Sequence, residues 1–131
     1  MLINIVGLIL GLFHLVGPIP SDLGVHQGQL SICESSNHCA RIEWKLNDPT
    51  ANFAQLAETI KETPRSVIVE QTSNYLHATI SSKIFGFVDD LEVLADPERS
   101  ILQARSVSRL GESDFGVNQQ RLLSLQDTLL K

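Results

Sequence analysis

Basic residues are scarce in this chain of 131 residues, which has 10 lysines and arginines against 15 aspartates and glutamates. The resulting net charge of -5 gives no bulk-charge indication of nucleic-acid binding. The sequence also lacks internal repeats and low-complexity runs, so a repeat architecture is not expected. No catalytic or cofactor motif stands out, and we expect no cofactor. With 43% hydrophobic residues over this length, we expect one domain with a small core.

Cysteine is also scarce, because the chain has only Cys33 and Cys39, with five residues between them. This spacing differs from the two intervening residues of a redox pair. A structural zinc site normally has four ligands, and only His38 and His26 lie near, so no metal site is expected. In an exported chain, two cysteines this close favour a disulfide that closes a short loop. Such a bond would contribute about 2 kcal/mol and act mainly on local shape.

No lysine or arginine occurs before Arg41, and the run MLINIVGLILGLFHLV at residues 1–16 is almost wholly apolar. A signal peptide normally starts with positive charge and ends at small residues, and this run lacks both features. A membrane-spanning helix normally needs about 20 apolar residues, so the run is also short for that role. Three interpretations stay open: an uncleaved membrane anchor, a cleaved or truncated export signal, or a buried helix.

The chain divides into three parts by composition. We expect an apolar leader or anchor over residues 1–17, an extended irregular tether with the cysteine loop over 18–49, and an α+β domain over 50–131. Prolines and glycines break any regular pattern in the tether, namely Pro18, Pro20, Gly24 and Gly28.

Two helices are expected, one at each end of the domain. Asp48 can cap the first helix and Pro49 suits its first position, and Pro64 ends it. Asp114 or Asn118 can cap the last helix. Apolar residues recur at helical spacing in both, so each helix should pack one face against a core.

Between the helices, apolar and polar residues alternate with the two-residue period of strands. The expected strands cover residues 65–73, 75–82, 87–95 and 100–109. These strands predict a four-stranded antiparallel sheet in meander order. We expect both helices on the sheet face that carries Val69, Ala78, Leu91 and Ala104.

One row of charged residues is expected on the less apolar face of this sheet. In the expected register Glu70 lies opposite His77, His77 opposite Asp90, and Asp90 opposite Arg105. Cross-strand pairs of opposite charge contribute about 0.2–1 kcal/mol each, which explains the row as structural. The alternative is a ligand-binding or acid–base role for His77, since a carboxylate often orients such a histidine. No serine or cysteine obviously pairs with His77 as a nucleophile.

Asp89 is expected on the core face, opposite Ser106, where an unpaired carboxylate would be costly to bury. Either nearby serines and backbone donors satisfy Asp89, or it marks a functional pocket with a shifted pKa. A further candidate is an anion-binding loop after the last strand. Its residues would be Ser108, Arg109, Gly111, Ser113 and Asp114.

Three short patterns occur in order in the second half of the chain: FVDD, RSxSRxG and SDxGVNxxR. With PSDLGV at 20–25, CESSNHC at 33–39 and TPRSVIVEQTSNYLHA at 63–78, the chain resembles the family called domain of unknown function 1499. The resemblance covers nearly everything from Pro20 onward. It implies a small, often exported protein of bacteria, cyanobacteria or plastids, and no established activity. The chain departs from the pattern in the cysteine loop, where Glu34 and His38 replace the usual prolines; this affects loop rigidity, not the fold.

The expected function is non-enzymatic. We expect an exported or membrane-tethered module of the periplasm, thylakoid lumen or an equivalent compartment that binds a protein partner or stabilises a membrane-associated assembly. The second sheet face supports this expectation, because Ile68, Val88 and Val107 would form a mixed patch beside the charges. The rival hypothesis is a small-ligand-binding protein or enzyme. It would use His77, Asp90 and Arg105, or a pocket at Asp89.

Overall fold

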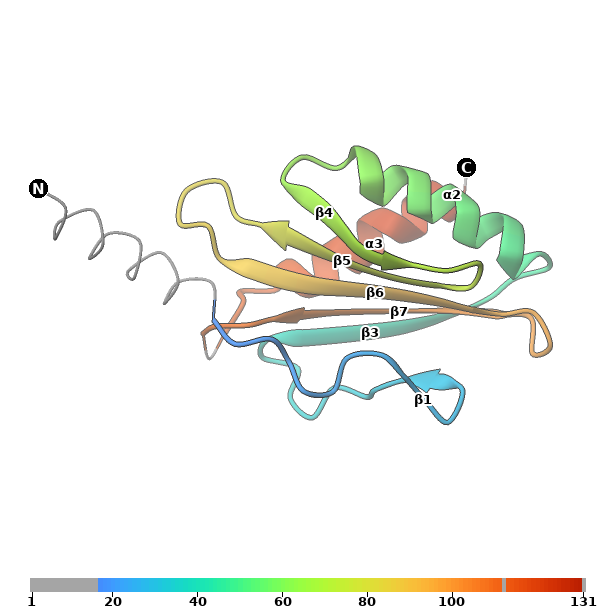
Figure 1. The fold of residues 1–131 in the computed structure, drawn as a ribbon, viewed down its shortest axis with the longest axis horizontal. Helices are drawn as coiled ribbons and strands as arrows, with labels where there is room; N and C mark the ends of the chain where they lie inside the picture. The colour runs from blue at the N-terminus through green and yellow to red at the C-terminus, as the bar shows by residue number, and fades with distance from the viewer. Residues whose placement is uncertain (1–16, 112, 131) are drawn as a thin grey trace, which may run out of the picture.

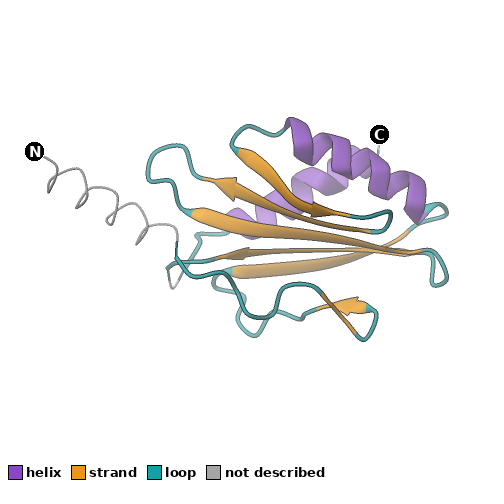
Figure 2. Cartoon of the chain, viewed as in Figure 1, coloured by secondary structure: helices purple, strands orange, loops and turns teal. Residues whose placement is uncertain are grey.

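The computed structural model describes residues 17–111 and 113–130, so residues 1–16 of the expected leader lie outside the described residues. The described chain is an α+β fold with two helices, a five-stranded antiparallel sheet and a two-stranded sheet (Figures 1 and 2). Neither helix in this part of the chain has the length and apolar character needed to span a bilayer. The elements are β1 (Val25–His26), β2 (Gln29–Leu30), β3 (Cys39–Lys45), α2 (Pro49–Glu62), β4 (Ser66–Gln71), β5 (Tyr75–Ser81), β6 (Val88–Asp96), β7 (Ile101–Ser108) and α3 (Val117–Leu129).

The first helix, α2, begins as predicted. The carboxylate of Asp48 accepts a hydrogen bond from the backbone N–H of Ala51 at 3.1 Å, which satisfies a free donor of the first turn. The cap of α3 differs from the prediction. Gly116, with φ of 84°, occupies the N-cap position in place of Asp114 or Asn118. A left-handed backbone angle is easily adopted only by glycine, so Gly116 sets the direction in which α3 leaves its loop.

The large sheet has one strand more than predicted. Its order is β3-β7-β6-β5-β4, so the meander of β4 to β7 is confirmed and β3 adds a fifth strand beside β7. The prediction of an irregular segment throughout 18–49 was therefore wrong for Cys39–Lys45. Ala40, Ile42 and Trp44 alternate there with Arg41, Glu43 and Lys45, which is the two-residue period of a strand. The Trp44 indole also donates to the Gln126 Oε1 atom at 2.9 Å, which ties β3 to α3.

The register of the central strands is shifted from the prediction by two residues. Glu70 does lie opposite His77, but His77 lies opposite Glu92 and Arg105 also lies opposite Glu92. Asp90 pairs with Val107, not with Arg105. The turn between β6 and β7 explains part of the shift, because Ser100 takes a left-handed φ of 57° and moves the first pair of the hairpin to Asp96 and Ile101. A shift of two residues keeps every side chain on its predicted face.

A β-bulge in β4 changes which of its residues face the helices. The register shifts between Ile68 and Glu70, so Val69 is the extra residue. Ile68 packs against the core below the helices, whereas Val69 is 56% exposed. The predicted faces of Ile68 and Val69 were therefore wrong, because a bulge reverses the alternation that sequence periodicity assumes.

Both faces of the large sheet are covered. Buried side chains of α2, α3 and the sheet form one core cluster that includes Leu56, Leu91 and Leu122. The other face carries residues 17–38, in which the small β1–β2 hairpin lies away from the helices (Figure 1). There Leu30 packs with Tyr75 and Leu94 of the sheet in a second, smaller buried cluster.

The predicted mixed patch on the second face is therefore not exposed. Val88 is 9% and Val107 is 6% exposed, because the segment before β3 covers this side of the sheet. The prediction of an exposed apolar patch for protein binding on that face was therefore wrong.

The predicted disulfide between Cys33 and Cys39 is present, with the two Cα atoms 5.6 Å apart. The loop that it closes contacts both β7 and the start of α3. The His38 carbonyl accepts hydrogen bonds from the backbone N–H of Ser108 at 2.9 Å and from the side-chain amide of Asn118 at 3.2 Å. The disulfide thus fixes the shape of the loop, and the loop in turn holds the end of the sheet in place.

We expect the double substitution Cys33→Ser/Cys39→Ser to lower the free energy of unfolding by about 2 kcal/mol, since a short loop loses its closure constraint. The sheet should stay folded, because its core lies elsewhere. Hydrogen exchange should show faster exchange at the amides of Ser108 and Asp114, which donate to His38 and Asn37 of the loop. Unchanged exchange at these two amides would show that the bond has only local effect.

Candidate functional site

The three sequence patterns meet at one end of the large sheet. Asp89 and Asp90 lie near the start of β6, and Ser106, Ser108 and Arg109 lie at or just after the end of the antiparallel β7. Because neighbouring residues of a strand point to opposite faces, Asp89 and Asp90 lie on different sides of the sheet. The site therefore consists of separate polar clusters, one facing the helices and others facing residues 17–38.

The Asp89 cluster faces the helices. The guanidinium of Arg121 in α3 donates from its Nη1 atom to Asp89 Oδ2 at 2.8 Å, Ser106 Oγ at 3.0 Å and Asn118 Oδ1 at 3.1 Å. The Ser106 hydroxyl donates to Asn118 Oδ1 at 2.6 Å. Asp89 is thus hydrogen-bonded, but its donor is Arg121, which sequence reasoning missed, and not the nearby serines or backbone donors that the structural interpretation predicts.

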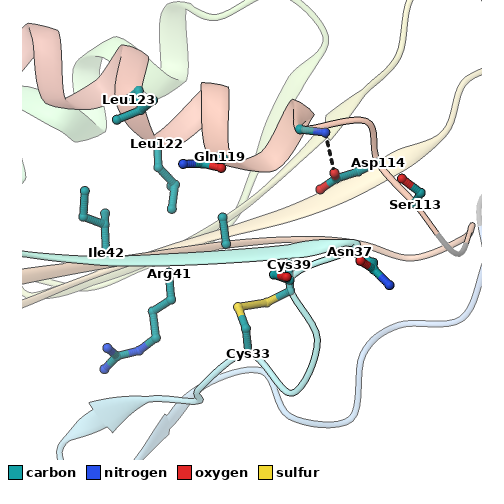
Figure 3. A pocket seen from close by; sticks show the side chains of 13 residues that line it. Cys33, Asn37, Cys39, Arg41, Ile42, Ser113, Asp114, Gln119, Leu122 and Leu123 are labelled. Carbon is teal, nitrogen blue, oxygen red and sulfur yellow. Dashed lines mark hydrogen bonds between the residues drawn. A yellow bond between two sulfur atoms is a disulfide. The ribbon is translucent and has the colours of Figure 1, made fainter.

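Asn118 connects the Asp89 cluster to the loop before α3. Its amide donates to Ser108 Oγ at 2.8 Å and to Asp114 Oδ2 at 2.6 Å, and the side chain is fully buried. The backbone N–H of Gly116 donates to Asp114 Oδ1 at 2.7 Å, as the dashed line in Figure 3 marks. Partial burial would raise the pKa of Asp114, but the donors from Asn118 and Gly116 outweigh it and hold this pKa below its ordinary value. Asp114 is therefore ionised and stabilises the loop by accepting these hydrogen bonds.

The Asp90 cluster lies on the opposite face. Arg109 binds the fully buried Asp90 with two hydrogen bonds, from Nε to Oδ2 at 2.8 Å and from Nη2 to Oδ1 at 3.0 Å. His77 Nε2 lies 2.7 Å from the same Oδ1 atom. Burial alone would raise the pKa of Asp90, but the hydrogen bonds from His77 and Arg109 hold it below its ordinary value. The same contact with Asp90 raises the pKa of Arg109.

A third cluster forms around Glu92, a residue that sequence reasoning did not select. The Tyr75 hydroxyl and the backbone N–H of Gly24 both donate to Glu92 Oε2, at 2.6 Å and 2.7 Å. Arg105 lies between two carboxylates, donating to Glu92 Oε1 at 3.4 Å and to Asp22 Oδ2 at 2.6 Å. Burial and the Glu92 carboxylate raise the pKa of Tyr75, so the phenol stays a donor.

The structure thus brings some predicted site residues together and separates others. His77, Asp90 and Arg109 form one contact set, and Arg105 belongs to the Glu92 cluster because the register is shifted. Glu70 is exposed on the edge strand β4 and stays outside all three clusters. For two of the missed residues a signal was present in SDxGVNxxR, in which Asn118 and Arg121 are spaced to share one face of a helix.

This arrangement offers little acid–base chemistry. A general base needs an accessible lone pair near its substrate and a pKa near the working pH. Asp90 is fully buried and has a lowered pKa, and its two oxygens already accept hydrogen bonds. Across residues 17–111 and 113–130, no group of three or more His, Cys, Asp or Glu side chains is arranged to hold a metal ion.

Three cavities lie near these clusters. The first, of about 560 Å³, is a groove between the edge of β3, the disulfide loop and the start of α3 (Figure 3). The second, of about 510 Å³, lies beside Arg105 and Arg109 under residues 18–22. The third, of about 380 Å³, lies between α2 and α3 and is lined in part by Arg121. In the groove at β3, side chains of α3 meet an edge of β3 with which no other strand of residues 17–111 and 113–130 pairs.

We expect Arg121→Met to lower the free energy of unfolding by about 3 kcal/mol, because it leaves Asp89 in a mostly buried position without its charged partner. Adding Asp89→Asn should recover part of this loss, since the unpaired charge is then removed. Arg99→Met is the matched control, because Arg99 pairs with Asp96 at an exposed turn and should change stability by less than about 1 kcal/mol. Equal losses for the two arginines in urea unfolding would contradict the buried pair.

The pairing of Asp90 should also appear in the pH dependence of stability. A carboxylate whose folded pKa lies below its ordinary value of 3.8 contributes stability that is complete above that value and is lost as the pH falls through the folded pKa. We expect Asp90→Asn to be less stable than the wild type at pH 7 by on the order of 2 kcal/mol, and this difference to shrink as the pH is lowered below about 4. Asp127→Asn, at an exposed position of α3, is the control. A difference that does not change with pH would contradict the assignment.

Comparison with known proteins identifies the family. A family model described as "Protein of unknown function (DUF1499)" matches residues 22–129, which include Asp22, the disulfide and all three polar clusters. A search of curated proteins finds no match. Because the match covers most of the chain, this protein belongs to the DUF1499 family.

Proposed function

We propose that this protein is a non-enzymatic module that binds an extended segment of a partner protein within a membrane-associated assembly outside the cytoplasm. The observation that carries this proposal is the free edge of β3. One edge of β3 pairs with β7, and among the described residues no strand lies along the other edge, which faces the 560 Å³ groove. An extended peptide can add to such an edge through backbone hydrogen bonds.

The walls of the groove suit a peptide better than a small polar substrate. Backbone donors and acceptors of Cys39 to Ile42 would run along one side. Leu122 and Leu123 of α3 lie across from them, and Leu123 is 37% exposed (Figure 3). Alternate side chains of an added strand would therefore meet apolar contacts toward α3, which is how such sites gain specificity.

The polar clusters support a non-enzymatic role. Each buried carboxylate of β6 accepts a hydrogen bond from a charged or hydroxyl donor. These interactions stabilise the fold by compensating the cost of burying the charge. The rival hypothesis of an enzyme or small-ligand site at His77, Asp90 and Arg105 needed open, convergent groups. His77 and Asp90 are instead paired with each other, Arg105 is paired with Glu92, and all three side chains are buried on the face that residues 17–38 cover.

The compartment is supported by two features. Disulfides persist in oxidising environments outside the cytoplasm, and Cys33–Cys39 is a disulfide. The apolar run at residues 1–16 is the sequence feature expected of an export signal or anchor. Both support an exported protein held at or near a membrane.

The groove can be tested by placing a photo-crosslinking amino acid at position 123, with position 67 on the far edge strand as the matched exposed control. We expect a protein cross-link from position 123 only, which mass spectrometry should locate in one partner segment. A synthetic peptide of that segment should bind the wild type and bind Leu123→Asp at least about tenfold more weakly, which corresponds to about 1.4 kcal/mol. A cross-link to a small molecule, or equal peptide affinity for both proteins, would overturn the proposal.

A further inference from the structure

Exposed apolar side chains gather at one end of the domain. The loop between β5 and β6 carries Ile84, Phe85 and Phe87, of which Ile84 is 82% exposed. Phe115, in the loop before α3, is 96% exposed. Ile19, just after the point where the described chain begins, is also exposed. Single exposed apolar residues are ordinary, and what distinguishes these five large ones is that three separate segments bring them to one end of the domain. We call these five residues the apolar end.

Contacts within the fold place the three segments at the same end. The backbone N–H of Arg109 donates to the Val88 carbonyl, so the end of β7 lies beside the loop that ends at Phe87. Gly17 lies against Arg109 and Leu110, where an added Cβ would come within 2.7 Å of Leu110. Asn118 binds Ser108, which brings the start of α3 to the same place. Figure 1 shows these segments at the left of the molecule, where the described chain begins.

The opposite end of the sheet differs in character. The turn between β6 and β7 there contains Asp96, Glu98 and Arg99, and the turn between β4 and β5 contains Ser73 and Asn74. The chain is therefore asymmetric along its strands, with one polar end and one apolar end.

The sequence before Gly17 indicates what covers the apolar end. Residues 1–16 contain no aspartate, glutamate, lysine or arginine and are almost wholly apolar, and they join the domain at Gly17. If this run is the membrane anchor that its composition allows, it would bring the apolar end to the membrane surface. Aromatic side chains and a nearby cation suit the bilayer interface, and Lys83 and Arg65 are exposed beside Ile84 and Ser81.

We propose that the apolar end is a membrane-docking surface, which seats the domain against the bilayer through Ile84, Phe85, Phe87, Phe115 and Ile19. The inference deepens the membrane-associated part of the proposed function and is independent of the groove at β3. Docking by loops in addition to the leader gives the domain a fixed orientation. Attachment by the leader alone would not set this orientation.

The test uses the full chain reconstituted into phosphatidylcholine vesicles with or without brominated acyl chains, which quench tryptophan only inside the bilayer. Phe85→Trp and Phe115→Trp report on the apolar end, and Val67→Trp on exposed β4 is the control. Trp44, the single native tryptophan, is buried against Gln126 and gives the same background in every variant. Near-ultraviolet circular dichroism confirms that each variant is folded.

We expect brominated lipid to remove most of the added emission in Phe85→Trp and Phe115→Trp and to leave that of Val67→Trp unchanged. Quenching at neither position 85 nor 115 in vesicle-bound protein would overturn docking, because the domain would then be tethered without contact. A blue shift without quenching would mean that another protein or a second copy covers the patch, and would also overturn it. Failure of the vesicles to bind the chain has the same consequence. None of these outcomes bears on peptide binding in the groove, so the two proposals fail separately.

Discussion

Three buried carboxylates on the central strand β6 each need a hydrogen-bond donor, and this requirement determines how the other elements pack around the strand. Asp89, Asp90 and Glu92 are each at most 8% exposed. A buried charge without a partner costs several kcal/mol, so each of these residues requires a donor from another element. Asp89 obtains it from α3, Asp90 from the end of β7 and from β5, and Glu92 from β5, β7 and the segment before β3. The two layers that cover the sheet are thereby fixed to its middle strand.

This pairing explains why the charged face of the sheet is closed. Arg105 joins Glu92 to Asp22, and Gly24 donates to Glu92, so the segment before β3 is bound across the sheet and not free as a tether. The disulfide loop also holds Asn118 and Ser108, because the carbonyl of its His38 accepts a hydrogen bond from each of them. Groups that resemble a catalytic site in sequence thus serve as connections between layers.

The functions that we propose depend on surfaces that the polar clusters hold in place. The groove at β3 includes Asp114 and Gly116, which flank Phe115 of the apolar end. A partner segment bound along β3 would therefore lie close to the membrane surface on which we propose the domain docks. The two proposed surfaces are compatible in space, which suits a protein that positions a partner at a membrane.

Local features of this protein follow directly from its sequence. Two-residue alternation placed Asp89 and Asp90 on opposite faces, and Asp48 with Pro49 set the start of α2, because both effects act between near neighbours. Tertiary structure alone decided the register, the bulge at Val69, and the partners Arg121, Glu92 and Asp22. A register shifted by two residues has the same periodicity in sequence, so only turn geometry and packing across the sheet could select the observed one. The partners were decided in the same way, since residues 83 positions apart, such as Asp22 and Arg105, meet only after the layers have assembled.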